Sequence, residues 1–271
     1  MLSSIGMTIQ SIDTSIAANT TISHKHRATE LDVIRGFAIF LTIVHHFMYD
    51  VHYIFGYPSF SWLFGKAMES FYHLPGYIIF LGVSGVSSSF SRNNLKRSGR
   101  LALISIGLTL ITSIISIVTK SDYYILWQML HCLAFSTMLN GLFERTALKE
   151  KTKIVILLLT GFLVVFYLPH IIRTFKLDSK GSPLLLPFGI GHLRPEVPAM
   201  IDYLPLIPYS GCFFVGVALG KIIYPDGKVQ KPYCTGKVFK PLAFMGRHSL
   251  LIYAIHQPLL IALIWLWTKI F

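Results

Sequence analysis

About seven apolar segments, each long enough to cross a lipid bilayer as a helix, constrain the fold of this chain more than any other feature. A helix needs about 20 mainly apolar residues to cross roughly 30 Å of hydrocarbon. Hydrophobic residues make up 53% of the chain, too many for a soluble domain with one modest core. The segments are residues 31–50, 71–90, 100–118, 125–143, 152–170, 201–223 and 248–268. The sequence therefore predicts an all-α fold, a polytopic bundle of about seven transmembrane helices.

The chain divides into a short leading segment and one membrane domain. Residues 1–26 are rich in Ser and Thr and lack the apolar core and basic cluster of a secretory signal, so we expect a disordered cytoplasmic segment. No polar stretch after it exceeds the roughly thirty residues of 171–200, which is too short for an independent core. Residues 27–271 are therefore expected to form a single transmembrane domain.

The uneven distribution of Lys and Arg between loops predicts the orientation in the membrane. Short cytoplasmic loops of membrane proteins are enriched in these residues. In the seven-helix arrangement, the side that holds the N-terminal segment carries more than twice as many Lys and Arg as the other side. We therefore expect a multi-pass protein of the bacterial cytoplasmic membrane, with its N-terminus in the cytoplasm.

The net charge of +12 indicates membrane lipids rather than nucleic acid as a partner. The basic residues are dispersed along membrane loops, with no nucleic-acid recognition module around them. Anionic lipid headgroups explain most of the excess, and part of it could receive a phosphate-rich cosubstrate. The three cysteines, Cys132, Cys212 and Cys234, have no metal-ligand spacing, so neither a disulfide nor a metal is expected.

The first apolar segment carries ionisable side chains at both of its ends. Such groups are costly in hydrocarbon and usually face a partner, a water-filled cavity or a reactive site. Arg35 and His46 are eleven residues apart, which places them on one helix face at a separation of roughly 16 Å. His46 and Asp50 are one turn apart, so the carboxylate can orient the imidazole and favour its protonated form.

Polar side chains from four expected helices meet at the external side of the predicted bundle. These residues are His46, Asp50, His73, His131 and Asp202. Convergence of polar groups from separate segments is typical of a catalytic site. A single polar residue in a membrane helix is as often a hydrogen-bonding partner for another helix, and this interpretation is kept for His45, His52, Gln128 and His248.

Five segments taken together resemble a known family. They are RATELDVIRGFAIFLTIVHHFMYD, IIFLGVSGVSSSFSR, WQMLHCLAFSTML, DYLPLIPYSGCFFVGVALG and MGRHSLLIYAIHQPLLI. In this order they resemble bacterial members of the heparan-alpha-glucosaminide N-acetyltransferase catalytic-domain family of transmembrane acyltransferases. The similarity runs from about residue 27 to residue 268. The first segment also looks like the wider class of membrane acyltransferases that modify surface polysaccharides.

The resemblance implies transfer of an acyl group, usually acetyl, from cytoplasmic acyl-CoA to an amine or hydroxyl of a sugar or glycoconjugate across the membrane. Acetyl-CoA is then the cosubstrate, and the expected partners are acyl-CoA, the sugar acceptor and membrane lipids, with homodimer formation left open. His46 is the expected general base or transient acyl carrier, oriented by Asp50.

The remaining candidate residues divide between the acceptor and the donor. For binding the acceptor or polarising the thioester carbonyl the candidates are His73, His131 and Asp202, with Arg194 in the loop 171–200 as a further acceptor contact. Arg35 and Arg247 are candidates for binding CoA phosphates, because Arg makes bidentate contacts with phosphate. His256 is expected along the thioester path between these two levels.

Three alternatives stay open at this point. Lysosomal members of the family have Asn in the place of His46 and a catalytic histidine after the first helix, which leaves His52 or His73 as the base. A transporter or flippase for a small or lipid-linked sugar would need a polar path, although the halves of the chain show no internal repeat. A haem protein would need histidines paired between adjacent helices.

Overall fold

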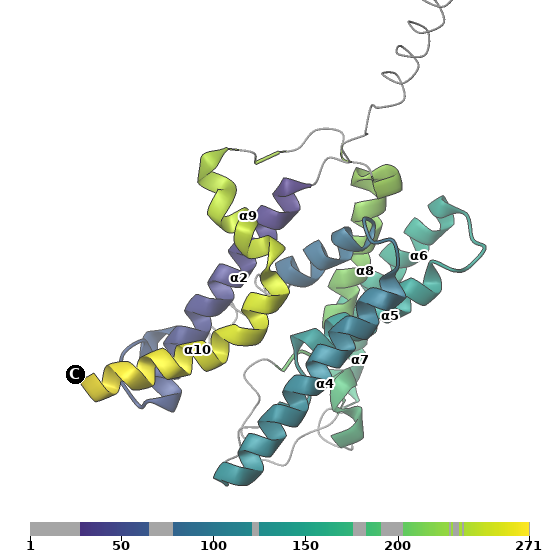
Figure 1. The fold of residues 1–271 in the computed structure, drawn as a ribbon. Helices are drawn as coiled ribbons and strands as arrows, with labels where there is room; N and C mark the ends of the chain where they lie inside the picture. The colour runs from purple at the N-terminus through teal and green to yellow at the C-terminus, as the bar shows by residue number, and fades with distance from the viewer. Residues whose placement is uncertain are drawn as a thin grey trace, which may run out of the picture.

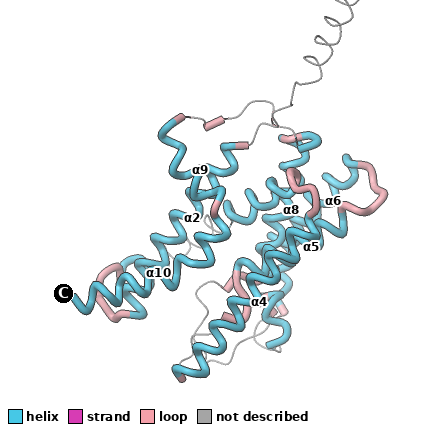
Figure 2. Tube along the Cα trace, in the orientation of Figure 1, coloured by secondary structure: helices cyan, strands magenta, loops and turns pink. Residues whose placement is uncertain are grey.

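The computed structural model describes residues 28–64, 78–120, 125–175, 183–190, 203–227, 229, 233–234 and 236–270. Throughout these ranges the chain is helical or in loops, and none of the described residues lies in a strand (Figures 1 and 2). The prediction of an all-α bundle is therefore confirmed. The principal helices are α2 (Thr29–Tyr49), α4 (Asn94–Thr119), α5 (Met129–Phe143), α6 (Glu150–Phe162), α7 (Leu168–Thr174), α8 (Leu206–Ile223), α9 (Lys240–Arg247) and α10 (Ser249–Ile270).

Five helical stretches in the described part of the chain have the length and composition of membrane spans. They are Thr29–Ile54, Asn94–Thr119, Glu150–Thr174, Leu206–Ile223 and Ser249–Ile270. Two of them contain a π-helical turn, η1 (Asp50–Ile54) after α2 and η3 (Leu163–Tyr167) between α6 and α7. The expected segments 71–90 and 125–143 contain the shorter apolar helices Ile78–Ser88 and α5. The chain is thus a multi-pass helical membrane protein.

The described helices form two groups, which Figure 1 shows side by side. In one group α2 packs against both α9 and α10, and in the other α4 packs on α5 while α6 packs on α8. The eight-residue helix α9, absent from the predicted set, lies across the first half of α2. It leads directly into α10, so the last helix starts from a position that α2 and α9 fix together.

The helix Ile78–Ser88 connects the two groups. On one side Ser87 accepts a hydrogen bond from Arg35 of α2, and on the other Ser88 accepts one from Asn140 of α5. Its backbone also lies directly against α8, because a Cβ added to Gly85 would be 2.1 Å from the carbonyl oxygen of Phe213. Small residues permit such close approach of membrane helices. This helix therefore sets the spacing between α2 and the α4–α8 group.

Candidate active site

Two buried histidines from different helices meet inside the described bundle. His46 lies in the last turn of α2, and His256 lies in the second turn of α10. Their ring centroids are 4.8 Å apart with an interplanar angle of 74°, and each residue is buried. His256, which was expected between the donor and acceptor levels, thus lies at the same level as His46.

Asp50 lies one turn beyond His46 and contacts the residue that follows His256. Its carboxylate is completely buried, and its Oδ1 accepts a hydrogen bond of 2.7 Å from Nε2 of Gln257. Asp50 is also the first residue of the π-helical turn η1, a feature that is frequent at functional sites. Two consecutive residues of α10 therefore face two residues one turn apart on the first membrane span, Thr29–Ile54.

Tyr253 and Gln128 extend this group of polar side chains to the start of α5. The hydroxyl of Tyr253 donates to Oε1 of Gln128 at 3.0 Å, and Nδ1 of His256 lies 2.6 Å from the carbonyl oxygen of Tyr253. Both Tyr253 and Gln128 are buried. We call this group the histidine centre, and its members are His46, Asp50, Gln128, Tyr253, His256 and Gln257.

His131 is held at the start of α5 by local contacts. Its Nδ1 accepts the backbone N–H of Gln128 at 3.3 Å, which forms one half of a capping box, and its Nε2 lies 3.3 Å from the hydroxyl of Thr109. The ring also stacks on Trp127. These contacts give His131 a structural role in positioning Gln128, and a role toward substrate stays a prediction.

The other end of α2 carries a positively charged site. Arg35 forms an ion pair with Asp32 at 3.3 Å and donates to the hydroxyl of Ser87. Arg97, near the start of α4, lies close enough for its charge to act on that of Arg35. Two guanidinium groups, together with the hydroxyl of Ser87, favour binding of an anion, because Arg matches phosphate geometry with two hydrogen bonds.

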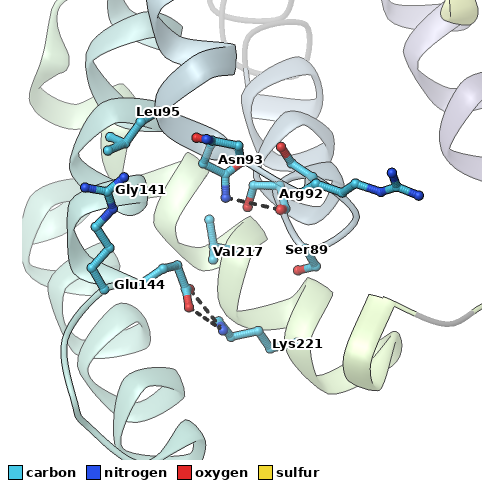
Figure 3. A pocket seen from close by; sticks show the side chains of 12 residues that line it. Ser89, Arg92, Asn93, Leu95, Gly141, Glu144, Val217 and Lys221 are labelled. Carbon is cyan, nitrogen blue, oxygen red and sulfur yellow. Dashed lines mark hydrogen bonds and ion pairs between the residues drawn. The ribbon is translucent and has the colours of Figure 1, made fainter.

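A pocket of about 350 Å³ adjoins this charged site (Figure 3). Ser88 and Ser89, next to Ser87, line it, and Asn93 caps the N-terminus of α4 at its edge by accepting the Lys96 amide. Hydroxyls and a helix N-terminus are favourable surroundings for an anion. The full lining is Ser88, Ser89, Ser91, Arg92, Asn93, Asn94, Leu95, Gly141, Glu144, Arg145, Val217 and Lys221.

An ion-pair network closes one side of the pocket. Lys221 of α8 contacts Glu144 at 2.9 Å, as Figure 3 shows, and Glu150 at 2.8 Å. The buried Lys153 lies 3.6 Å from the Glu144 carboxylate and 3.4 Å from that of Glu150. The network joins the ends of α5, α6 and α8. Ion pairs between three helix ends therefore hold this side of the pocket in place.

The pocket lined by Arg92, Arg145 and Lys221 is not evident from the sequence, where these three residues lie far apart. The available signal was the run SSSFSRNN, which places hydroxyls and an Asn cap before a helix. What could not be read from this run is that the ends of α5 and α8 meet it. That arrangement depends on tertiary packing between three segments.

The other predicted site residues are distributed as follows. Arg247 is exposed at the end of α9, and it follows Gly246, which touches the backbone of Asp32. His52 has its Nδ1 3.0 Å from the carbonyl oxygen of Tyr57. His73, Arg194 and Asp202 lie outside the described residues.

Among the described residues, no group of three or more His, Cys, Asp or Glu side chains could hold a metal ion. The described cysteines are free, and Cys132 is buried in α5. The arrangement instead offers a buried imidazole pair at one level of the bundle and an anion-binding surface at another.

Comparison with known proteins places this arrangement in a family. Searches of curated proteins and of solved structures gave no match. The family described as heparan-alpha-glucosaminide N-acetyltransferase, catalytic, matches residues 27–258, a range that includes both Arg35 and His256. A match over most of the chain, on a helical membrane bundle, identifies a membrane acetyltransferase. The chain belongs to the heparan-alpha-glucosaminide N-acetyltransferase catalytic-domain family.

Proposed function

We propose that this protein transfers the acetyl group of cytoplasmic acetyl-CoA to an amine or hydroxyl of a sugar or glycoconjugate at the extracytoplasmic side. The observation that carries the proposal is the presence of two polar sites along α2. Arg35 belongs to an anion-binding surface, and the buried His46–His256 pair lies roughly 16 Å further along the same helix. A donor with phosphates at one end and a thioester at the other matches this separation.

The phosphates of the donor bind at the Arg35 end of the bundle. Arg35 and Arg97 contribute two guanidinium groups there, and the neighbouring pocket adds Arg92 and Arg145. The N-terminus of α4 contributes its backbone amides next to the same pocket. Arg247 is a further candidate, since α9 holds it beside the first turns of α2.

The transfer step takes place at the histidine centre. Neutral His46 removes the proton from the acceptor amine or hydroxyl as that group attacks the thioester carbonyl carbon. The new C–N or C–O bond forms, the C–S bond breaks, and CoA leaves as a thiolate. The imidazolium of His46 then passes its proton to neutral His256, and His256 delivers it to the thiolate sulfur, so that both histidines end neutral and charge and protons balance.

Asp50 stabilises the positive charge that His46 acquires, because a carboxylate one helical turn away favours imidazolium. Gln257 holds that carboxylate in place. The acceptor approaches from the far end of α2, and His73, Asp202 and Arg194 stay the proposed acceptor contacts from the sequence. Since one base serves both an amine and a hydroxyl, the site suits either kind of acceptor.

The test measures acetyl-CoA consumption by purified protein in detergent, with glucosamine and simple glycosides as acceptors. We expect His46→Ala to lower kcat by about 10²- to 10⁴-fold, the usual contribution of a general base, with the Kd for CoA unchanged. His52→Ala and His73→Ala serve as comparisons. Equal turnover in His46→Ala, with loss in one of the comparisons, would move the base to that residue. Failure of the native protein to bind CoA would contradict the proposed donor.

A further inference from the structure

A row of buried polar side chains follows α5 from one polar site to the other. Cys132, Ser136 and Asn140 recur every fourth residue on one face of α5, and Gln128, the N-cap of this helix, continues the spacing. Thr137 lies beside them, and each of the five is at most 2% exposed. We call these five residues the α5 row. It spans twelve residues, or ~18 Å.

The two ends of the α5 row are tied to the two sites already described. At one end Gln128 accepts the hydrogen bond of Tyr253 and thereby belongs to the histidine centre. At the other end Asn140 donates to the hydroxyl of Ser88 at 3.3 Å, and Ser88 lines the pocket together with Gly141. The row therefore connects the pocket with the imidazole pair through the interior of the protein.

Several atoms of the row retain hydrogen-bonding capacity. Oδ1 of Asn140, Nε2 of Gln128 and Oγ1 of Thr137 are buried and have no hydrogen-bond partner among the residues that the structure describes. Buried polar atoms are nearly always paired, and leaving them unpaired is destabilising. One of these atoms is an amide donor and another an amide acceptor at the opposite end of the row, so an extended ligand with an N–H group toward one end and a carbonyl oxygen toward the other would satisfy both.

We propose that the α5 row binds the pantetheine arm of acetyl-CoA and directs the thioester to the His46–His256 pair. This inference rests on the proposed function, since it takes acetyl-CoA as the donor. The arm has the length of about four to five extended peptide units, ~15 Å, which is close to the length of the row. Oδ1 of Asn140 accepts from the amide N–H of the arm that lies nearer the phosphates, and Nε2 of Gln128 donates to the carbonyl oxygen of the thioester.

The test compares CoA with a smaller ligand that lacks the arm and one of the three phosphate groups of CoA. CoA carries the pantetheine arm, whereas adenosine 3′,5′-bisphosphate keeps phosphates and lacks it. We expect Asn140→Ala to raise the Kd for CoA by about tenfold, the usual effect of one lost hydrogen bond in a buried site, and to leave the Kd for the bisphosphate unchanged. Thr137→Val, which keeps the side-chain shape, should weaken CoA binding in the same selective way.

Controls separate this result from damage to the fold. Ser105→Ala removes a buried hydroxyl that is bonded within its own helix α4, and it should change neither Kd. If Asn140→Ala and Thr137→Val bind CoA as tightly as the native protein, or lose affinity for both ligands equally, the α5 row does not bind the arm. If the native protein binds neither ligand, the proposed donor itself is wrong.

Discussion

His46 and His256 pack ring against ring with their centroids 4.8 Å apart, although they belong to the first and the last helices of the described chain. The contact depends on how α9 sets the start of α10 against α2, because α9 packs on α2 and ends two residues before α10 begins. The imidazole pair is therefore a product of helix packing and not of local sequence.

Replacement of His256 tests whether the second imidazole acts in proton transfer. We expect His256→Ala to lower kcat by about 10²-fold, near the lower end for a group that transfers protons, and to leave the Kd for CoA within twofold. His256→Phe keeps a ring against His46 but cannot carry a proton. If His256→Phe restores turnover to the native value, His256 only packs against His46. The exposed His248 provides a control, since His248→Ala should keep native turnover.

Replacement of Gln257 tests the support of the buried carboxylate. Gln257→Leu removes the 2.7 Å hydrogen bond to Asp50 and leaves that carboxylate less solvated, so the free energy of unfolding should fall by about 1–3 kcal/mol. The measurement is denaturation in detergent. Thr268→Ala, on the exposed part of α10, should change it by less than about 0.5 kcal/mol. Equal stability of Gln257→Leu and the native protein would show that Asp50 does not depend on this bond.

Helix periodicity predicted the polar features that lie within a single helix. The length of the first apolar segment and the three-turn spacing of Arg35 and His46 both follow from helix geometry, which tertiary contacts hardly alter. The depth of His256 was predicted less well, because the position of α10 along its own axis depends on α9. That short amphipathic helix has no apolar run long enough to reveal it.

The contact partners of polar residues could not be predicted for a similar reason. His131 shares a helix end with Gln128, and the capping box between them engages the ring that was expected to face substrate. Glu or Gln is the usual residue at the third position of such a helix, so a His there does not indicate a capping box from sequence alone. The ion pairs of Lys221 likewise depend on tertiary packing, because they form only where α8 meets the ends of α5 and α6.

The pH dependence of stability should show the contribution of Tyr203. Burial raises the pKa of Tyr203 to about 12, and its hydroxyl donates to the carbonyl oxygen of Leu186 at 2.6 Å. Above pH 10 the unfolded chain loses this proton before the folded protein does, so stability falls as the pH rises from 10 to 12. Tyr203→Phe should flatten this part of the curve of melting temperature against pH. A decline as steep as in the native protein would assign the loss to other groups.

The close contact between α9 and α2 gives a prediction about stability and donor binding together. A Cβ added to Gly246 would lie 1.7 Å from the carbonyl oxygen of Asp32, an atom of helical backbone that cannot turn aside. Gly246→Ala must therefore separate α9 from α2, and overpacking of this kind costs about 1–3 kcal/mol.

Because Asp32 pairs with Arg35, the shift should also weaken CoA binding at that end of α2. Thermal denaturation in detergent and the Kd for CoA are the two measurements. Gly99→Ala and Gly107→Ala are matched controls on α4, where an added Cβ meets nothing within 4 Å, and both should keep native stability or gain slightly, since Ala favours a helix. If Gly246→Ala melts at the same temperature as these controls, α9 and α2 have room for the added methyl group. In that case α9 does not fix the position of α10.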